Sequence, residues 1–122
     1  MNTVNKPEKS LTKDDILRIS SVYKGHIRNE AGLETALRAG ARRGTFKRTA
    51  YLWRAILASS PFADGDKRTA FAVADIMFAS SGRSLSRTQK EALVRAVIRV
   101  SKENITRLGR IERLLRYAVN GE

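Results

Sequence analysis

Residues 60–80 read SPFADGDKRTAFAVADIMFAS, and the second part of this stretch decides the fold. From Lys67 to Ser80, apolar side chains cover nearly the whole circumference of a predicted helix: Phe71, Val73, Ala74, Ile76, Met77 and Phe78. A helix that is apolar all round must be surrounded by other elements. We therefore expect this helix at the centre of the domain, with Gly82 ending it.

Helical patterns flank this central stretch on both sides. Five of them occupy residues 12–27, 30–39, 48–59, 86–102 and 105–119. Two of these helices begin with a predicted capping box, formed by Thr12 with Asp15 and by Ser86 with Gln89. Residues 41–47 (ARRGTFK) are irregular or strand-like. The sequence therefore predicts an all-α fold, a compact bundle of five to six helices around one central buried helix.

The chain has 122 residues, which fits one domain. We expect residues 1–10 to form a flexible tail and residues 11–120 a single helical domain. The absence of cysteine excludes a disulfide framework, a thiolate zinc site and a cysteine nucleophile. No apolar run approaches the roughly 18 residues of a membrane span, and the polar N-terminus lacks the pattern of a signal peptide. These features favour a cytoplasmic protein without a membrane partner.

Charge is the compositional outlier, because 24 Lys and Arg face 12 Asp and Glu, a net charge of +12. Seven cations recur at helical spacing on the last two predicted helices: Arg95, Arg99, Lys102, Arg107, Arg110, Arg113 and Arg116, of which the first six are the candidate nucleic-acid contacts. Such a stripe is either a solvated face or a surface that binds nucleic acid or an acidic protein through phosphates or carboxylates. The lack of clustered aromatic residues argues against stacking on single strands. The apolar stripe predicted for residues 86–102 consists of Leu93, Val94, Val97 and Ile98.

The loop before the central helix has the chemistry of an anion site. The first amides of a helix lack internal partners and lie at the positive end of its dipole, so anions bind there. Lys67 and Arg68 add two cations, Gly65 gives the backbone freedom, and Asp64 offers a carboxylate to magnesium beside a phosphate. Alternatively, Asp64 or Asp66 caps the helix and both cations are solvated.

Residues 60–70 resemble the Fic/Doc motif His-Pro-Phe-x-(Asp/Glu)-Gly-Asn-(Gly/Lys)-Arg. The match is to the Doc branch, in which Lys follows the Asn position and Thr-Ala follows Arg. Residues 11–17 (LTKDDIL) and 27–37 (IRNEAGLETAL) are similar to Doc segments in the same order, and residues 79–85 resemble the turn after the motif helix. The resemblance thus covers residues 11–85.

This resemblance implies a Fic/Doc-like helical fold whose loop holds the phosphates of ATP, with Mg²⁺. Fic proteins transfer AMP to a protein hydroxyl, whereas Doc proteins transfer the terminal phosphoryl group to a translation factor, elongation factor Tu. The resemblance also implies an antitoxin partner. By the same resemblance, Phe62 anchors the loop, and residues 41–47 occupy the place of a flap that pairs with a target strand.

The resemblance implies which residues of this chain would bind the phosphates and which would hold the metal. The amides of Gly65, Asp66 and Lys67 would form an anion hole, and Arg68 would bind a phosphate. Asp64 would hold magnesium.

Two residues depart from the motif. Ser60 occupies the position of the catalytic histidine, and a serine cannot act as a general base near neutral pH. Asp66 replaces the asparagine and adds a negative charge beside the proposed phosphates. These departures favour a toxin-family protein impaired in transfer; an enzyme that tolerates them and a basic module without catalysis are the alternatives. His26 is the only histidine and could cap a helix or replace the missing base, and Asp75 is expected to pair with an arginine or to lie at an exposed edge.

Overall fold

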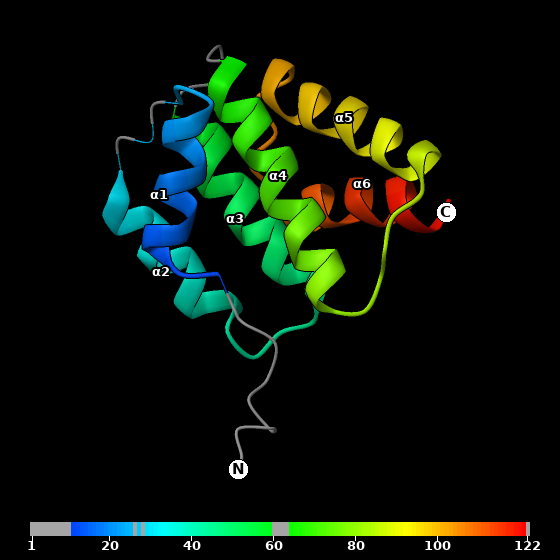
Figure 1. Cartoon of the computed structure of the whole chain (residues 1–122), viewed down its shortest axis with the longest axis horizontal. Coiled ribbons are helices and arrows are strands. Elements are labelled where there is room, and N and C mark those ends of the chain that lie inside the picture. Colours follow the sequence, from blue (N-terminus) through cyan, green and yellow to red (C-terminus); the bar gives the residue numbers. More distant parts are fainter. Residues whose placement is uncertain (1–10, 26, 28, 60–63, 122) are drawn as a thin grey trace.

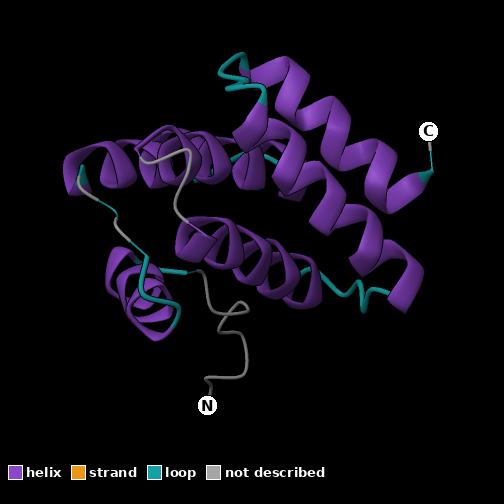
Figure 2. Ribbon diagram, turned by 90° about the horizontal axis from the view of Figure 1, so that it is seen from above, coloured by secondary structure: helices purple, strands orange, loops and turns teal. Residues whose placement is uncertain are grey.

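The computed structural model describes residues 11–25, 27, 29–59 and 64–121, and this part of the chain is helical, with no strand (Figures 1 and 2). Its helices are α1 (Lys13–Val22), α2 (Glu30–Gly40), α3 (Thr45–Ser59), α4 (Asp64–Ser80), α5 (Arg87–Lys102) and α6 (Leu108–Asn120). The all-α prediction is therefore confirmed. None of the described helices is long and apolar enough to cross a membrane.

Two helices share the middle of the bundle. α3 and α4 lie between α1 and α2 on one side and α5 and α6 on the other (Figure 1). α3 packs against α2, α4, α5 and α6, whereas α4 packs against α1, α3 and α5. The predicted central helix is α4, yet it keeps Ile76 38% exposed, while Trp53 of α3 is fully buried. Trp53 Nε1 donates to the carbonyl of Ala70 at 2.8 Å, which joins the two inner helices.

Four predicted boundaries were wrong. α1 ends at Val22 rather than at residue 27, since the chain turns through Lys24 at a φ of 58°. Residues 41–47 are not strand-like; they form a turn and then the first turn of α3, where the Arg48 amide bonds the Gly44 carbonyl at 3.0 Å. α4 begins at Asp64, so the glycine of the motif lies inside the helix. α6 begins at Leu108 rather than at residue 105, after the chain turns through Asn104 at a φ of 51°. Gly82 ends α4 as predicted, at a φ of 93°.

Both predicted capping boxes are confirmed. The Thr12 hydroxyl accepts from the Asp15 amide at 3.1 Å, and the Asp15 carboxylate accepts from the Thr12 amide at 3.0 Å. At the start of α5, the Ser86 hydroxyl accepts from the Gln89 amide at 3.1 Å and the Gln89 carboxamide accepts from the Ser86 amide at 2.6 Å. Gln89 Nε2 also donates to the Val119 carbonyl at 2.8 Å, so the start of α5 is tied to the end of α6.

We expect Ser86→Ala to lower the free energy of unfolding by about 1 kcal/mol, because the substitution leaves the Gln89 amide without its capping acceptor. Urea denaturation of both proteins measures the difference. Thr88→Ala is the matched control, since Thr88 is exposed in the same helical turn and its substitution should change stability by less than about 0.5 kcal/mol. Equal losses in the two variants would show that the cap contributes nothing specific.

Candidate functional site

The first turn of α4 lies directly against the turn that follows α1. Gly65 is buried, and a Cβ placed on it would lie 2.4 Å from the carbonyl oxygen of Tyr23 and 2.7 Å from the amide nitrogen of Gly25. A Cβ placed on Gly25 would lie 2.7 Å from Asp66 Oδ1 and 2.6 Å from Ser20 Oγ. The two glycines therefore allow two backbones to touch. Close packing, and not freedom to wrap an anion, explains the glycine at position 65.

Asp66 is fully buried at this junction, beside Gly25, and it does not line the neighbouring groove. The negative charge expected beside the phosphates is therefore directed toward α1. Asp64 and Asp66 both lie in the first turn of α4, where carboxylates interact favourably with the helix dipole. Because these two carboxylates offset the positive charges of Lys67 and Arg68, the two cations do not by themselves require an external anion.

A groove of about 370 Å³ runs between the N-terminal half of α4 and α5. The described residues that line this α4–α5 groove are Tyr23, Asp64, Lys67, Arg68, Phe71, Val94, Val97 and Ile98. The charged motif residues line the groove from α4, and Val94, Val97 and Ile98 form an apolar wall on the α5 side. The structure thus brings three of the predicted site residues into one concave surface, with an aromatic ring from the end of α1.

The apolar wall of this groove differs from the predicted buried stripe of α5. Leu93 and Val97 are buried as expected, but Val94 is 43% exposed and Ile98 is 46% exposed. The prediction for these two residues was wrong, because the core side of α5 is completed by smaller or later residues, Ala96 and Val100. Two large aliphatic side chains are therefore left facing the groove and solvent.

Asp64 and Arg68 form an ion pair within the first turns of α4. Arg68 Nε donates to Asp64 Oδ2 at 2.9 Å, and both side chains are mostly exposed. An exposed pair of this kind contributes less than about 1 kcal/mol, so a phosphate can displace the carboxylate at little cost. The described residues contain no group of three or more His, Asp or Glu side chains that could hold a metal. Asp64 would therefore hold Mg²⁺ only together with phosphate oxygens and water.

Several predicted residues lie elsewhere or beyond the described part of the chain. Ser60, Phe62 and His26 fall outside the described residues. Asp75 pairs with a lysine and not with an arginine, since Lys90 Nζ lies 3.8 Å from its Oδ2. That ion pair links α4 to α5 and takes no part in the groove.

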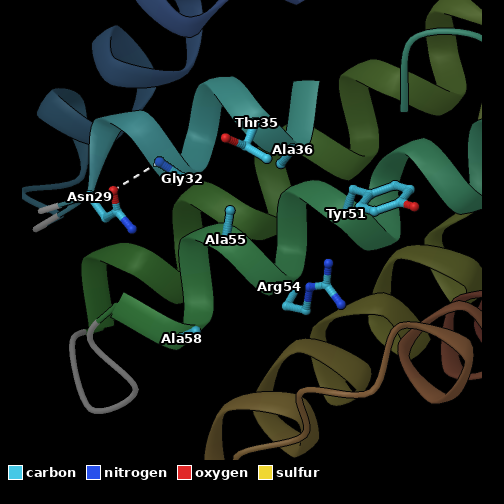
Figure 3. A pocket seen from close by; sticks show the side chains of 8 residues that line it. All are labelled: Asn29, Gly32, Thr35, Ala36, Tyr51, Arg54, Ala55 and Ala58. Atoms are coloured by element: carbon cyan, nitrogen blue, oxygen red, sulfur yellow. Dashed lines mark hydrogen bonds between the residues drawn. The ribbon is translucent and has the colours of Figure 1, made fainter. Parts of the chain in front are cut away.

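A second cavity, of about 520 Å³, lies between α2 and α3 and was not predicted (Figure 3). Small residues form much of its lining: Gly32, Ala36, Ala55 and Ala58. Arg54 lies 5.5 Å from the ring centroid of Tyr51, and the side-chain oxygen of Asn29 is occupied by the Gly32 amide at 2.8 Å. Small residues on two successive helices were the available sequence signal. Among the described residues that line this cavity there is neither a carboxylate nor a histidine.

The basic face of α5 and α6 (Arg95, Arg99, Lys102, Arg107, Arg110 and Arg113) is only partly neutralised. Glu103 pairs with Arg99 at 3.1 Å and with Arg110 at 3.5 Å, so one carboxylate joins cations of the two helices. Within the described part of the chain, the other four cations form no ion pair. This face therefore presents an excess of positive charge.

No protein-family model matches this chain, and no curated protein or solved structure matches it either. The resemblance of residues 11–85 to Doc proteins therefore rests on the sequence motifs.

Proposed function

We propose that this chain is a Doc-like protein whose α4–α5 groove binds the phosphates of a nucleotide and whose transfer of a phosphoryl or AMP group to a protein hydroxyl is impaired. One observation carries the proposal: Asp64, Lys67 and Arg68, three residues of the motif, line a single groove that also has an apolar wall. A site with a few convergent polar groups on an apolar surface is the usual form of a ligand pocket.

The two parts of the groove fit the two parts of a nucleotide. Lys67 and Arg68 can make charge-assisted hydrogen bonds to phosphate oxygens. A magnesium ion on those oxygens would be held from the protein side by Asp64. The half-exposed side chains of Val94 and Ile98 and the ring of Tyr23 offer an apolar surface to the base.

The impairment follows from the residue at the motif's histidine position. Phosphoryl transfer depends on positioning and charge stabilisation, which the groove can supply, and on a group that orients or deprotonates the attacking hydroxyl. Ser60 has no proton acceptor that works near neutral pH. The groove would therefore hold a nucleotide with little turnover.

Calorimetric titration with ATP and Mg²⁺ tests nucleotide binding. We expect the native chain to bind and Arg68→Ala to bind about tenfold or more weakly, because a hydrogen bond to a charged group contributes about 1.5–3 kcal/mol. Arg87→Ala is the matched control: Arg87 makes the same type of exposed pair, with Glu91 at 3.4 Å, but it does not line the groove. Absence of ATP binding by the native chain, or an equal loss in both variants, would contradict the proposal.

A second candidate function is polyanion binding by the basic face of α5 and α6. Its supporting observation is that, among the described residues, only Arg99 and Arg110 of these six cations pair with a carboxylate, that of Glu103. Binding of this kind weakens steeply with added salt, because cations on the protein release counterions from the polyanion. Affinity for nucleic acid measured at rising salt concentration therefore tests it.

A further inference from the structure

The two halves of the basic face meet along a narrow hollow between α5 and α6. This α5–α6 seam has a volume of about 210 Å³ and is lined by Ala92, Arg95, Ala96, Arg99, Leu114, Tyr117 and Ala118. Three alanines keep its floor shallow and apolar. Its volume lies below the roughly 300 Å³ at which small-molecule pockets begin, so the seam fits one flat group and not a whole cofactor.

Tyr117 is the exceptional residue of this seam. It is 64% exposed, although tyrosine is a large aromatic side chain, and it lies on the solvent side of α6, away from the buried residues Ile111 and Leu115. Arg113 precedes it by one helical turn on the same face of α6. Arg95 and Arg99 line the seam from α5. An exposed ring is thus placed among guanidinium groups that come from two helices.

The positive charge around the ring is available to a ligand. Arg95 and Arg113 form no ion pair within the described residues, and the pair between Arg99 and Glu103 is about half-exposed on both sides. Arg99, which lines the seam, and Arg110 share Glu103, so a cation of α6 lies close to a cation of α5 beside the seam. A chain of phosphates laid along the seam would therefore meet arginines on both sides.

We infer that the α5–α6 seam is a stacking site for one base of a single-stranded nucleic acid, with the base on Tyr117 and the flanking phosphates on Arg95, Arg99 and Arg113. The inference rests on the second proposed function, polyanion binding by the same face. Aromatic rings beside cations are the usual platform for single strands, because every base has a face that can stack. The sequence alone argued against stacking, because aromatic residues are not clustered; packing of α5 on α6 places one ring, Tyr117, beside arginines, so the inferred site holds one base only.

The chemistry of the seam favours a single strand over two other polyanions. An acidic protein would pair its carboxylates with the arginines, but those carboxylates gain nothing from the exposed ring of Tyr117 or from the shallow apolar floor of the seam. A duplex presents phosphates but keeps the faces of its bases stacked inside the helix. An unpaired base with its flanking phosphates uses the ring and the arginines together.

Fluorescence anisotropy with a short labelled oligouridylate, and with an RNA duplex of the same length, tests this inference on the full chain. We expect Tyr117→Ala to weaken binding of the single strand about tenfold or more and to leave duplex binding unchanged, since stacking on one ring accounts for such a factor. Tyr117→Phe should keep the native affinity, because the ring remains. Arg95→Gln should weaken the binding of both the single strand and the duplex. It should also reduce the slope of log affinity against log salt concentration by about 1.

The outcomes distinguish a failure of the stacking site from a failure of polyanion binding, the function on which the stacking site rests. If Arg95→Gln weakens binding but Tyr117→Ala does not, the stacking site is wrong and polyanion binding stands. If neither variant weakens binding, or if native binding is insensitive to salt, both are wrong. Because Tyr117 is largely exposed, its substitution leaves the core intact, and circular dichroism of the variants confirms that they fold.

Discussion

Replacing Ser60 with histidine should raise the rate of phosphoryl or AMP transfer by about 10²- to 10⁴-fold, the usual contribution of a general base. The reason is chemical: the substitution restores a proton acceptor at the motif position where this chain has a hydroxyl. Transfer of label from ATP to elongation factor Tu, the target implied by the resemblance to Doc proteins, measures the gain, and labels on different phosphorus atoms distinguish the two reactions.

Two further variants make this test specific. Ser60→Asn introduces a polar side chain that cannot accept a proton near neutral pH, so it should give no gain. Combining Ser60→His with Arg68→Ala should remove most of the gain, because the phosphate would no longer be held in the α4–α5 groove. If Ser60→His binds ATP yet transfers no faster than the native chain, a missing base is not what limits the reaction.

Gly65→Ala should destabilise the fold by about 2–3 kcal/mol, a large effect for the addition of one methyl group. The new Cβ would lie 2.4 Å from the Tyr23 carbonyl oxygen and 2.7 Å from the Gly25 amide nitrogen. These are backbone atoms, which cannot rotate away as a flexible side chain can, so α1 and α4 must separate. Urea denaturation would show a lower midpoint with an unchanged slope.

Gly109→Ala is the matched control for this prediction. Gly109 also lies in the first turn of a helix, α6, but within the described part of the chain no atom beyond its chain neighbours and its own helix backbone lies within 4 Å of the position that its Cβ would take. The same substitution there should stabilise the protein by up to about 1 kcal/mol, since alanine favours a helix over glycine. If both variants shift the midpoint in the same direction, the close contact of α1 with α4 is not what requires a glycine at position 65.

Local sequence signals were sufficient to predict the helical fold and several helix ends. The capping boxes at Thr12 and Ser86 and the stop at Gly82 depend on residues within a few positions of one another, so the chain determines them before any tertiary packing forms. The error at residues 41–47 also has a local cause: the sequence pattern around these residues did not reveal that α3 begins at Thr45.

The candidate sites depended on the tertiary structure. The motif could be read from the sequence. Whether Asp66 faces a ligand or the interior, however, depends on where α1 ends, because the turn that follows α1 covers the Asp66 side chain. Likewise, periodicity could not decide whether Val94 and Ile98 or Ala96 and Val100 face the core. The apolar face of an amphipathic helix is wider than the part of it that a neighbouring helix covers, so some apolar side chains on that face stay exposed.

The sequence by itself therefore determined that this chain forms capped helices and that it is strongly basic, and it carries a motif that resembles that of Doc proteins beside its most apolar helix. Only the tertiary structure decided which of those side chains share a surface. It placed Asp64, Lys67 and Arg68 beside an apolar wall from α5, and it set Tyr117 among arginines of another helix. The physical reason is that helix formation depends on neighbours within one or two turns, whereas a binding surface is made by residues that meet only when the helices pack.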